Sequence, residues 1–215
     1  MTEKLRIKLT IIGILFFLYM NSNAQSFNLG VVAGFDVASL HLTNFSENNI
    51  LYEISPIATY NINGYLSFKN KSFLGFSVEP GVIRKGWNKS HNSNDPNKLR
   101  LYYLQLPILS DFYFSERLYF SIGPEINYLI SAKNKYESNT QDIVEYLNRF
   151  ELSGIAAISF KFNDTVSTSF RYSHGLTEIS KDIIWTDSEL ENPDDSKDFN
   201  QYFQIILKMR IKNWR

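Results

Sequence analysis

Ionisable residues of this chain recur at alternate positions of several segments, which would place them on one face of an extended strand. Two of them, Glu79 and Glu125, are carboxylic acids of the kind that glycoside hydrolases use as an acid and base pair. Such a set can also form a proton path or a network of mutually paired ions. The full set, with one glutamine, is Asp36, Glu79, Gln105, Asp111, Glu125, Glu151, Lys161, Arg171, Lys208 and Arg210. Which chemistry applies depends on the elements that carry these residues.

Other catalytic and metal-binding arrangements are not visible in the sequence. The histidines, His41, His91 and His174, show no metal-ligand spacing, and there is no cysteine to supply a thiolate. Ser173 and His174 are sequence neighbours and so lie on opposite faces of a strand, where they cannot form a nucleophile and base pair. The formal net charge is zero without a basic stripe, which argues against a nucleic-acid partner. We therefore expect no enzymatic activity, no cofactor and no metal.

The N-terminal segment has the form of a secretory signal peptide. Three basic residues, Lys4, Arg6 and Lys8, precede an apolar run over residues 9–20, and small residues at Ser22 and Ala24 follow it. The apolar run is too short for a transmembrane helix, which needs about 20 residues. We expect residues 1–24 to be a signal peptide that is cleaved near Ala24, and residues 25–215 to form one domain.

Strand periodicity dominates the rest of the chain. In residues 27–38 every second residue is apolar, and the same alternation returns in seven later segments. These segments are 54–68, 72–84, 99–114, 118–131, 150–162, 165–177 and 199–213. The connections alternate between short turns, at 69–71, 115–117 and 163–164, and long polar loops, at 42–53, 85–98, 132–149 and 178–198. The pattern predicts eight antiparallel strands joined up and down.

The two faces of the strands indicate what surrounds them. In residues 102–114, one face carries Leu104, Leu106 and Ile108, and the other carries Gln105 and Asp111. The polar faces along the chain are rich in glycine, serine and asparagine, which suit a narrow interior better than a water-exposed surface. The strands, about 13 to 16 residues long, suffice for tilted crossings of a bilayer. The prediction is an all-β, eight-stranded antiparallel up-and-down transmembrane β-barrel, with leucines facing lipid and polar side chains in the lumen.

This arrangement assigns the alternating ionisable set to the lumen as a structural polar network. Glu79, Glu125 and Arg171 fall near the same height, so we expect Arg171 to reach Glu125 or Glu79. Paired ions that plug the lumen are favoured over a polar conduit, because side chains fill the interior of an eight-stranded barrel. A glycosidase-like acid and base pair is disfavoured, because a sugar could not enter.

The last long loop, residues 178–198, carries an excess of acidic residues and one apolar triplet, Ile183, Ile184 and Trp185. The acidic residues do not follow the order of an EF-hand, so a solvated loop is favoured over a Ca²⁺ site. The triplet is a candidate surface contact, because exposed apolar groups mark contact surfaces. Folding back over the rim of the barrel is the alternative.

Short motifs resemble those of a known family. "YLQLP" at 103–107, Gly123-Pro124, and "RYSHGL" at 171–176 are similar to signatures of the PorT-like outer-membrane β-barrel protein family of Bacteroidetes. The resemblance covers the mature chain and implies an outer-membrane barrel with both termini in the periplasm. It also implies a link to protein export, because a family member takes part in the type IX secretion system. One departure is at the C-terminus, where Arg215 follows the aromatic Trp214.

The expected function is that of a non-enzymatic accessory or interaction barrel in the cell outer membrane. Its expected partners are outer-membrane lipid and, by family analogy, other envelope or secretion proteins. Two alternatives stay open: a small-solute pore or transporter, and a soluble periplasmic barrel that binds an apolar ligand.

Overall fold

The computed structural model describes residues 26–43, 53–69, 73–90, 97–136, 139–181 and 197–214. These residues form ten strands and one short 3-10 helix, η2 (Val144–Tyr146). The strands are β1 (Ser26–Thr43), β2 (Glu53–Lys69), β3 (Leu74–Val78), β4 (Gly81–Ser90), β5 (Asn97–Tyr113), β6 (Leu118–Tyr136), β7 (Asn139–Asp142), β8 (Phe150–Lys161), β9 (Val166–Gly175) and β10 (Lys197–Trp214).

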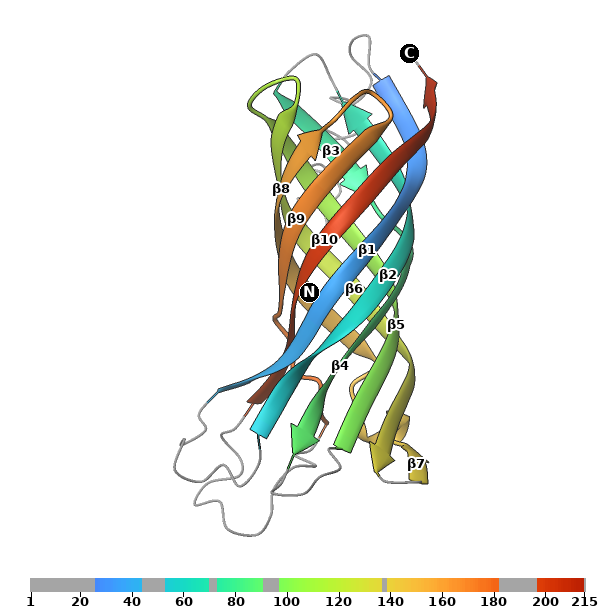
Figure 1. The fold of residues 1–215 in the computed structure, drawn as a ribbon, viewed down its shortest axis with the longest axis vertical. Helices are drawn as coiled ribbons and strands as arrows, with labels where there is room; N and C mark the ends of the chain where they lie inside the picture. Colours follow the sequence, from blue (N-terminus) through green and yellow to red (C-terminus); the bar gives the residue numbers. More distant parts are fainter. Residues whose placement is uncertain are drawn as a thin grey trace, which may run out of the picture.

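Antiparallel pairing closes the sheet into a barrel (Figure 1). Around the ring the order is β1, β2, β3 with β4, β5, β6, β8, β9 and β10, where β3 and β4 together fill one strand position between β2 and β5. The ring closes where β10 pairs with β1, from Phe27↔Trp214 to Thr43↔Lys197. Among the described strands, β7 pairs with the end of β6 alone and extends beyond the ring. Closure leaves the barrel strands without free edges, so their backbone groups are bonded to neighbours. The predicted eight-stranded antiparallel barrel is confirmed.

A proline splits the third strand of the barrel into β3 and β4. Pro80 has no N–H to give to a ladder, so regular pairing stops at Val78 and resumes at Gly81. Two backbone bonds hold the interruption in place: Gly64 N–H donates to Pro80 O (2.9 Å), and Glu79 N–H donates to Pro107 O (3.0 Å). The Glu79 side chain is buried in the lumen at this break.

The two ends of the barrel differ in their connections. At the end drawn uppermost in Figure 1, tight turns join β5 to β6 and β8 to β9, and the strand ends at Ser26 and Trp214 lie there too. Side chains fix these turns: Ser115 Oγ accepts from Leu118 N–H (3.0 Å), and Asn163 Oδ1 accepts from Val166 N–H (2.8 Å). We call this the short-turn end. The opposite, long-loop end carries β7 and η2.

The apolar residues of the strands form the outer surface. Large apolar side chains point outward along most strands of the ring, and among them Phe35, Phe170 and Ile205 lie side by side on three adjacent strands. Exposed aromatic residues, including Tyr60, Tyr128, Phe150 and Phe162, belong to the same face. Leu104 and Ile108 are exposed while Gln105 and Asp111 are buried. Within the described ranges there is no helix long and apolar enough to cross a membrane.

The strands extend further at the long-loop end than the sequence predicted. Residues 85–98 were predicted as a loop, but β4 continues to Ser90 and β5 begins at Asn97. The predicted loop 132–149 likewise contains the end of β6, all of β7 and η2. Both errors have one cause, because strand extensions beyond the apolar outer band lose the alternation on which the prediction depends.

Apolar side chains fill much of the lumen in the long-loop half, around a few buried polar residues, and this filling was not predicted from the sequence. Trp87, Leu101 and Leu129 are among its fully buried side chains. Together they belong to one cluster that also contains Ala38, Leu40, Ile57, Ile83, Leu99, Tyr103, Ala132, Ile143, Val144, Leu147, Ile179 and Tyr202. Backbone bonds from Asn148 to Ile179 O (2.7 Å) and from Lys181 to Tyr146 O (3.1 Å) tie the η2 segment to the chain beyond β9. We call this cluster of buried side chains the apolar plug.

Substituting Ile205 tests which face of the sheet meets lipid. Ile205 lies in the middle of β10 and is 60% exposed. Ile205→Lys is expected to destabilise the lipid-embedded barrel by about 2–4 kcal/mol, because an ammonium near the bilayer midplane loses its hydration. Urea unfolding in lipid vesicles measures the loss. Ile211→Lys, at a residue that is 67% exposed near the short-turn end, is the depth control and should cost about 1 kcal/mol or less. Equal, small losses at both positions would contradict the lipid-facing assignment.

Candidate functional site: buried charges in the lumen

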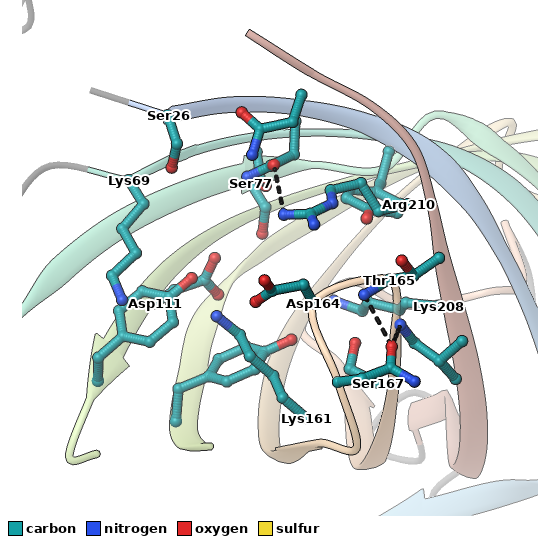
Figure 2. Close-up of a pocket in the computed structure, with 18 residues that line it drawn as sticks. Ser26, Lys69, Ser77, Asp111, Lys161, Asp164, Thr165, Ser167, Lys208 and Arg210 are labelled. Carbon is teal, nitrogen blue, oxygen red and sulfur yellow. Dashed lines mark hydrogen bonds between the residues drawn. The ribbon is translucent and has the colours of Figure 1, made fainter. Parts of the chain in front are cut away.

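A cavity of about 510 Å³ opens the lumen at the short-turn end (Figure 2). Four basic side chains line it, Lys69, Lys161, Lys208 and Arg210. Two acidic side chains, Asp111 and Asp164, line it as well, together with tyrosine and serine hydroxyls. The cavity is therefore a polar entrance with a positive balance of charge.

The first buried charge cluster, the Glu79 cluster, lies next to this cavity on its inner side and shares Lys208 with the cavity wall. Arg171 Nη2 is 2.7 Å from Glu79 Oε2, and Lys208 Nζ is 2.6 Å from Glu79 Oε1. Glu79 is fully buried, and Arg171 is nearly so. One carboxylate thus holds two cations, one on each oxygen, and the cluster carries a net charge of +1. Of the two partners expected for Arg171, the structure has Glu79.

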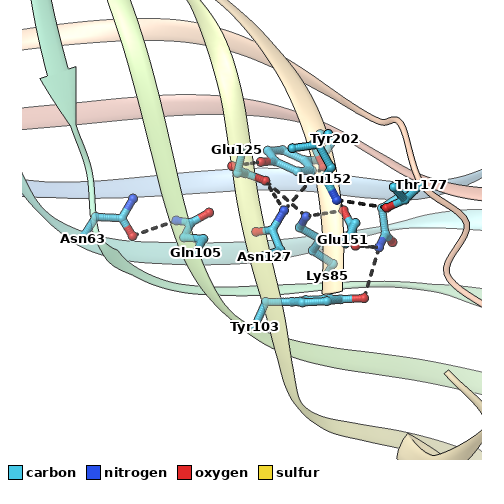
Figure 3. Close-up of polar contacts among 12 residues, drawn as sticks. Asn63, Lys85, Tyr103, Gln105, Glu125, Asn127, Glu151, Leu152, Thr177 and Tyr202 are labelled. Atoms are coloured by element: carbon cyan, nitrogen blue, oxygen red, sulfur yellow. Dashed lines mark hydrogen bonds and ion pairs between the residues drawn. The ribbon is translucent and has the colours of Figure 1, made fainter. Parts of the chain in front are cut away.

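The second cluster, the Lys85 cluster, has the inverse composition (Figure 3). Lys85 Nζ is 2.8 Å from Glu151 Oε1 and 3.3 Å from Glu125 Oε1, and all three side chains are buried. The aromatic rings of Tyr103 and Tyr202 face the same ammonium at 5.0 and 4.9 Å. One cation thus holds two carboxylates, and the cluster carries a net charge of −1.

Hydrogen bonds from neighbouring side chains reach all four carboxylate oxygens of the Lys85 cluster. Tyr202 OH donates to Glu125 Oε2 (2.5 Å), and Asn200 Nδ2 donates to Glu151 Oε2 (2.6 Å). Asn127 Nδ2 donates to Glu125 Oε1 (2.7 Å), and Ser153 Oγ donates to Glu151 Oε1 (3.0 Å). Buried charges are tolerated when they are both paired and hydrogen-bonded in this way.

The two clusters occupy neighbouring positions in the barrel wall. Glu79 N–H is bonded to Pro107 O, and Pro107 faces Glu125 in the register of β5 and β6. The Glu79 and Glu125 backbones are therefore separated by a single strand. The net charges of the two clusters, +1 and −1, therefore offset each other across one strand.

The other predicted lumen residues make smaller contacts. Asp36 accepts from Asn61 Nδ2 (2.7 Å), Gln105 Nε2 donates to Asn63 Oδ1 (2.7 Å), and Asp111 accepts from Ser121 Oγ (2.5 Å).

Two predicted lumen residues lie at the cavity rather than among the fully buried charges. Lys161 and Arg210 are half-buried, and within the described part of the chain neither forms an ion pair. Arg210 Nη1 makes a long hydrogen bond to Asn28 Oδ1 (3.4 Å). The surface triplet Ile183, Ile184 and Trp185 lies outside the described residues.

Sequence reasoning missed Lys85, the centre of the second cluster. It was placed in a loop, because the segment after Arg84 contains many polar residues. The sequence did contain a signal, because side chains alternate between the two faces of a strand. Ile83, Lys85 and Trp87 occupy alternate positions and all point inward, so extending the predicted strand beyond residue 84 would have placed Lys85 in the lumen. Tyr202 and Asn200 also alternate with outward residues on β10, but their partners are distant in sequence.

This arrangement suits ion pairing better than catalysis. Glu79 and Glu125 are both fully buried and each is bonded to a cation, so neither is presented to a substrate. Across the described residues, no group of three or more histidine, cysteine, aspartate or glutamate side chains is placed to hold a metal ion.

Comparisons with known proteins concern this same barrel. The sequence matches the family described as outer membrane protein beta-barrel domain over residues 23–181. Neisserial surface protein A has a similar structure, with 10% identity and a TM-score of 0.54, covering 88% of this chain and 100% of its own.

Two further solved structures are more distant. Ail, the attachment invasion locus protein of Yersinia pestis, has 12% identity and a TM-score of 0.47, covering 88% of this chain and 100% of its own. OprG from Pseudomonas aeruginosa has 10% identity and a TM-score of 0.47, covering 89% of this chain and 98% of its own. No curated protein matches the sequence.

Proposed function

Because the chain belongs to the outer membrane protein β-barrel domain family, we propose that it is a non-enzymatic, non-conducting barrel whose exposed ends contact other envelope proteins. The barrel lies in the outer membrane, and in barrels of this kind the short turns face the periplasm and the long loops face the cell exterior.

The filled lumen is the observation that carries the proposal. Beyond the cavity, the Glu79 and Lys85 clusters place buried, mutually paired ions across the interior. The apolar plug fills the long-loop half around the Lys85 cluster, with Ile83 and Trp87 on either side of Lys85 in β4. A solute pathway needs polar, solvated walls throughout, whereas paired ions and buried hydrocarbon side chains fill the interior here.

Planar-bilayer recordings test the absence of conduction. The purified barrel is expected to give no steady stepwise current under an applied voltage, because neither water nor ions have a continuous polar path. Protein-free vesicles of the same lipid serve as the blank, and heat-modified migration on gels verifies that the inserted protein is folded. Steady ohmic conductance from folded protein would contradict this function and favour a pore.

A role in protein export is the finer part of the proposal, and it rests on the motif resemblance to the PorT-like family. The "YLQLP" motif contributes Gln105 and Pro107 to the lumen, and "RYSHGL" contributes Arg171. We further propose that residues 1–24 are removed during export of the chain itself.

Two experiments in the native cell address these points. Crosslinking in intact cells, followed by mass spectrometry, identifies envelope proteins that contact the barrel and reads the mature N-terminus. A deletion strain is expected to secrete less of the proteins exported across the outer membrane. Unchanged secretion and no crosslinked envelope protein would contradict the accessory role.

A further inference from the structure

The cavity at the short-turn end has the charge and the donors of a ligand site. Lys69, Lys161 and Arg210 line it without an ion-pair partner among the described residues, while Lys208 holds Glu79 at its base. Four basic and two acidic side chains lie on its wall; because Lys208 is already paired with Glu79, the other three basic groups exceed the two acidic ones by one positive charge. A lumen that is narrow and bounded by protein screens charge less than bulk water does, so an anion gains more here than at an open surface.

Two ammonium groups share one aromatic ring in this wall. Lys69 Nζ lies 3.9 Å and Lys161 Nζ lies 4.8 Å from the centre of the Tyr113 ring, which stacks on Tyr119 at 5.0 Å. The faces of the tyrosine rings attract both ammonium groups, but a neutral ring carries no net negative charge that would offset the repulsion between them. An anion within reach of both ammonium groups would therefore be stabilised by both.

The hydroxyl groups of the cavity indicate the class of anion. The wall includes hydroxyls on Ser26, Ser67, Ser167, Thr165 and Tyr65, in addition to the basic groups. A phosphate group offers three or more oxygens, which can accept from several hydroxyls and ammonium groups at once, whereas a carboxylate offers two. The cavity of about 510 Å³ is also large enough for more than one phosphate group.

Among the described residues, the cavity is closed on its inner side. The Glu79 cluster lies at its inner end and the apolar plug lies beyond, so a ligand that enters from the short-turn end meets fixed ions and packed side chains. We propose that this cavity is a blind, periplasm-facing binding site for a phosphate-bearing anion, in which Lys69, Lys161 and Arg210 are the principal contacts. A free phosphate compound and the headgroup of an inner-leaflet lipid share this chemistry.

Calorimetry on the mature full-length barrel in non-ionic detergent tests the site, with inorganic pyrophosphate as the probe. Saturable binding is expected, and the variant Lys69→Gln/Lys161→Gln should weaken it at least about tenfold. The matched control is Lys98→Gln/Lys133→Gln, which removes the same charge from exposed lysines at the long-loop end and should leave the affinity unchanged. Circular dichroism verifies the fold of each variant, and Arg210→Gln, expected to weaken binding severalfold, serves as an independent second variant.

Two further titrations define the ligand. A titration with dihexanoyl phosphatidic acid distinguishes a lipid headgroup from a free phosphate compound. Binding of this lipid but not of pyrophosphate assigns the site to a headgroup. Binding of pyrophosphate assigns it to a soluble anion. Citrate separates the classes, because tighter binding of citrate than of either phosphate compound would overturn the phosphate assignment. No saturable binding of either phosphate compound, or equal weakening by both lysine pairs, would overturn the site itself, whether or not the barrel conducts.

Discussion

Substituting Lys85 by methionine is expected to lower the free energy of unfolding of the barrel by about 3–5 kcal/mol, because it leaves two buried carboxylates without a counter-ion. Glu125 and Glu151 both contact the Lys85 ammonium, and all three side chains are excluded from solvent. Methionine fills a similar volume, so the loss reports charge rather than a cavity. Urea unfolding in lipid vesicles, followed by tryptophan fluorescence, measures it.

Companion variants separate the buried ion from general effects of the substitution. Glu151→Gln alone should cost less than Lys85→Met, because Lys85 would keep Glu125 as its partner. The triple variant Lys85→Met/Glu125→Gln/Glu151→Gln should recover most of the lost stability, because replacing an entire buried ion network is often close to neutral. Lys98→Met, at an exposed lysine, is the control and should change stability by about 0.5 kcal/mol or less. A Lys85→Met barrel as stable as this control would contradict the pairing.

The barrel itself could be predicted from the sequence because its two faces meet different surroundings. Residues 102–114 alternate between exposed Leu104 and Ile108 and buried Gln105 and Asp111, so local periodicity was sufficient there. Local periodicity failed after Arg84, where the strand extends beyond the apolar outer band and its residues no longer alternate between polar and apolar. In the long-loop half the apolar residues Trp87 and Leu101 point into the lumen, whereas in the middle of the barrel the apolar residues of the strands point outward. Hydrophobicity alone does not distinguish an inward leucine from an outward one.

The charge clusters were harder to predict because their members come from strands far apart in the chain. The inward positions of Glu79, Glu125 and Arg171 follow from parity, and their similar height follows from counting along the strands. Which carboxylate Arg171 takes depends on the strand break at Pro80 and on the register around the whole ring. A strand predicted to end at residue 84 also removed Lys85 from consideration, so the central cation of the second cluster was missing.

Glu79→Gln is expected to be the most damaging single change in the other cluster, with a loss of about 3 kcal/mol or more. The substitution keeps the shape of the side chain but leaves Arg171 and Lys208 as two neighbouring cations without a carboxylate. Arg171→Met should cost less, because Glu79 would keep Lys208. In this cluster the loss of stability is thus expected to be larger for the carboxylate than for a cation. The reverse is expected around Lys85, because there the cation is the shared partner. Urea unfolding of the single variants measures both orders, and equal losses for Glu79→Gln and Arg171→Met would contradict the shared-partner geometry.

Combining Glu79→Gln with Lys85→Met tests whether the two clusters act on each other. Each substitution removes the shared ion of one cluster, so the double variant contains orphaned cations beside orphaned carboxylates, one strand apart across Pro107. Their attraction should make the combined loss smaller than the sum of the single losses by about 1 kcal/mol or more. A double-mutant cycle on the free energies of unfolding gives this coupling directly. Additive losses, within about 0.5 kcal/mol, would mean that the two clusters are independent ion networks that happen to share a lumen.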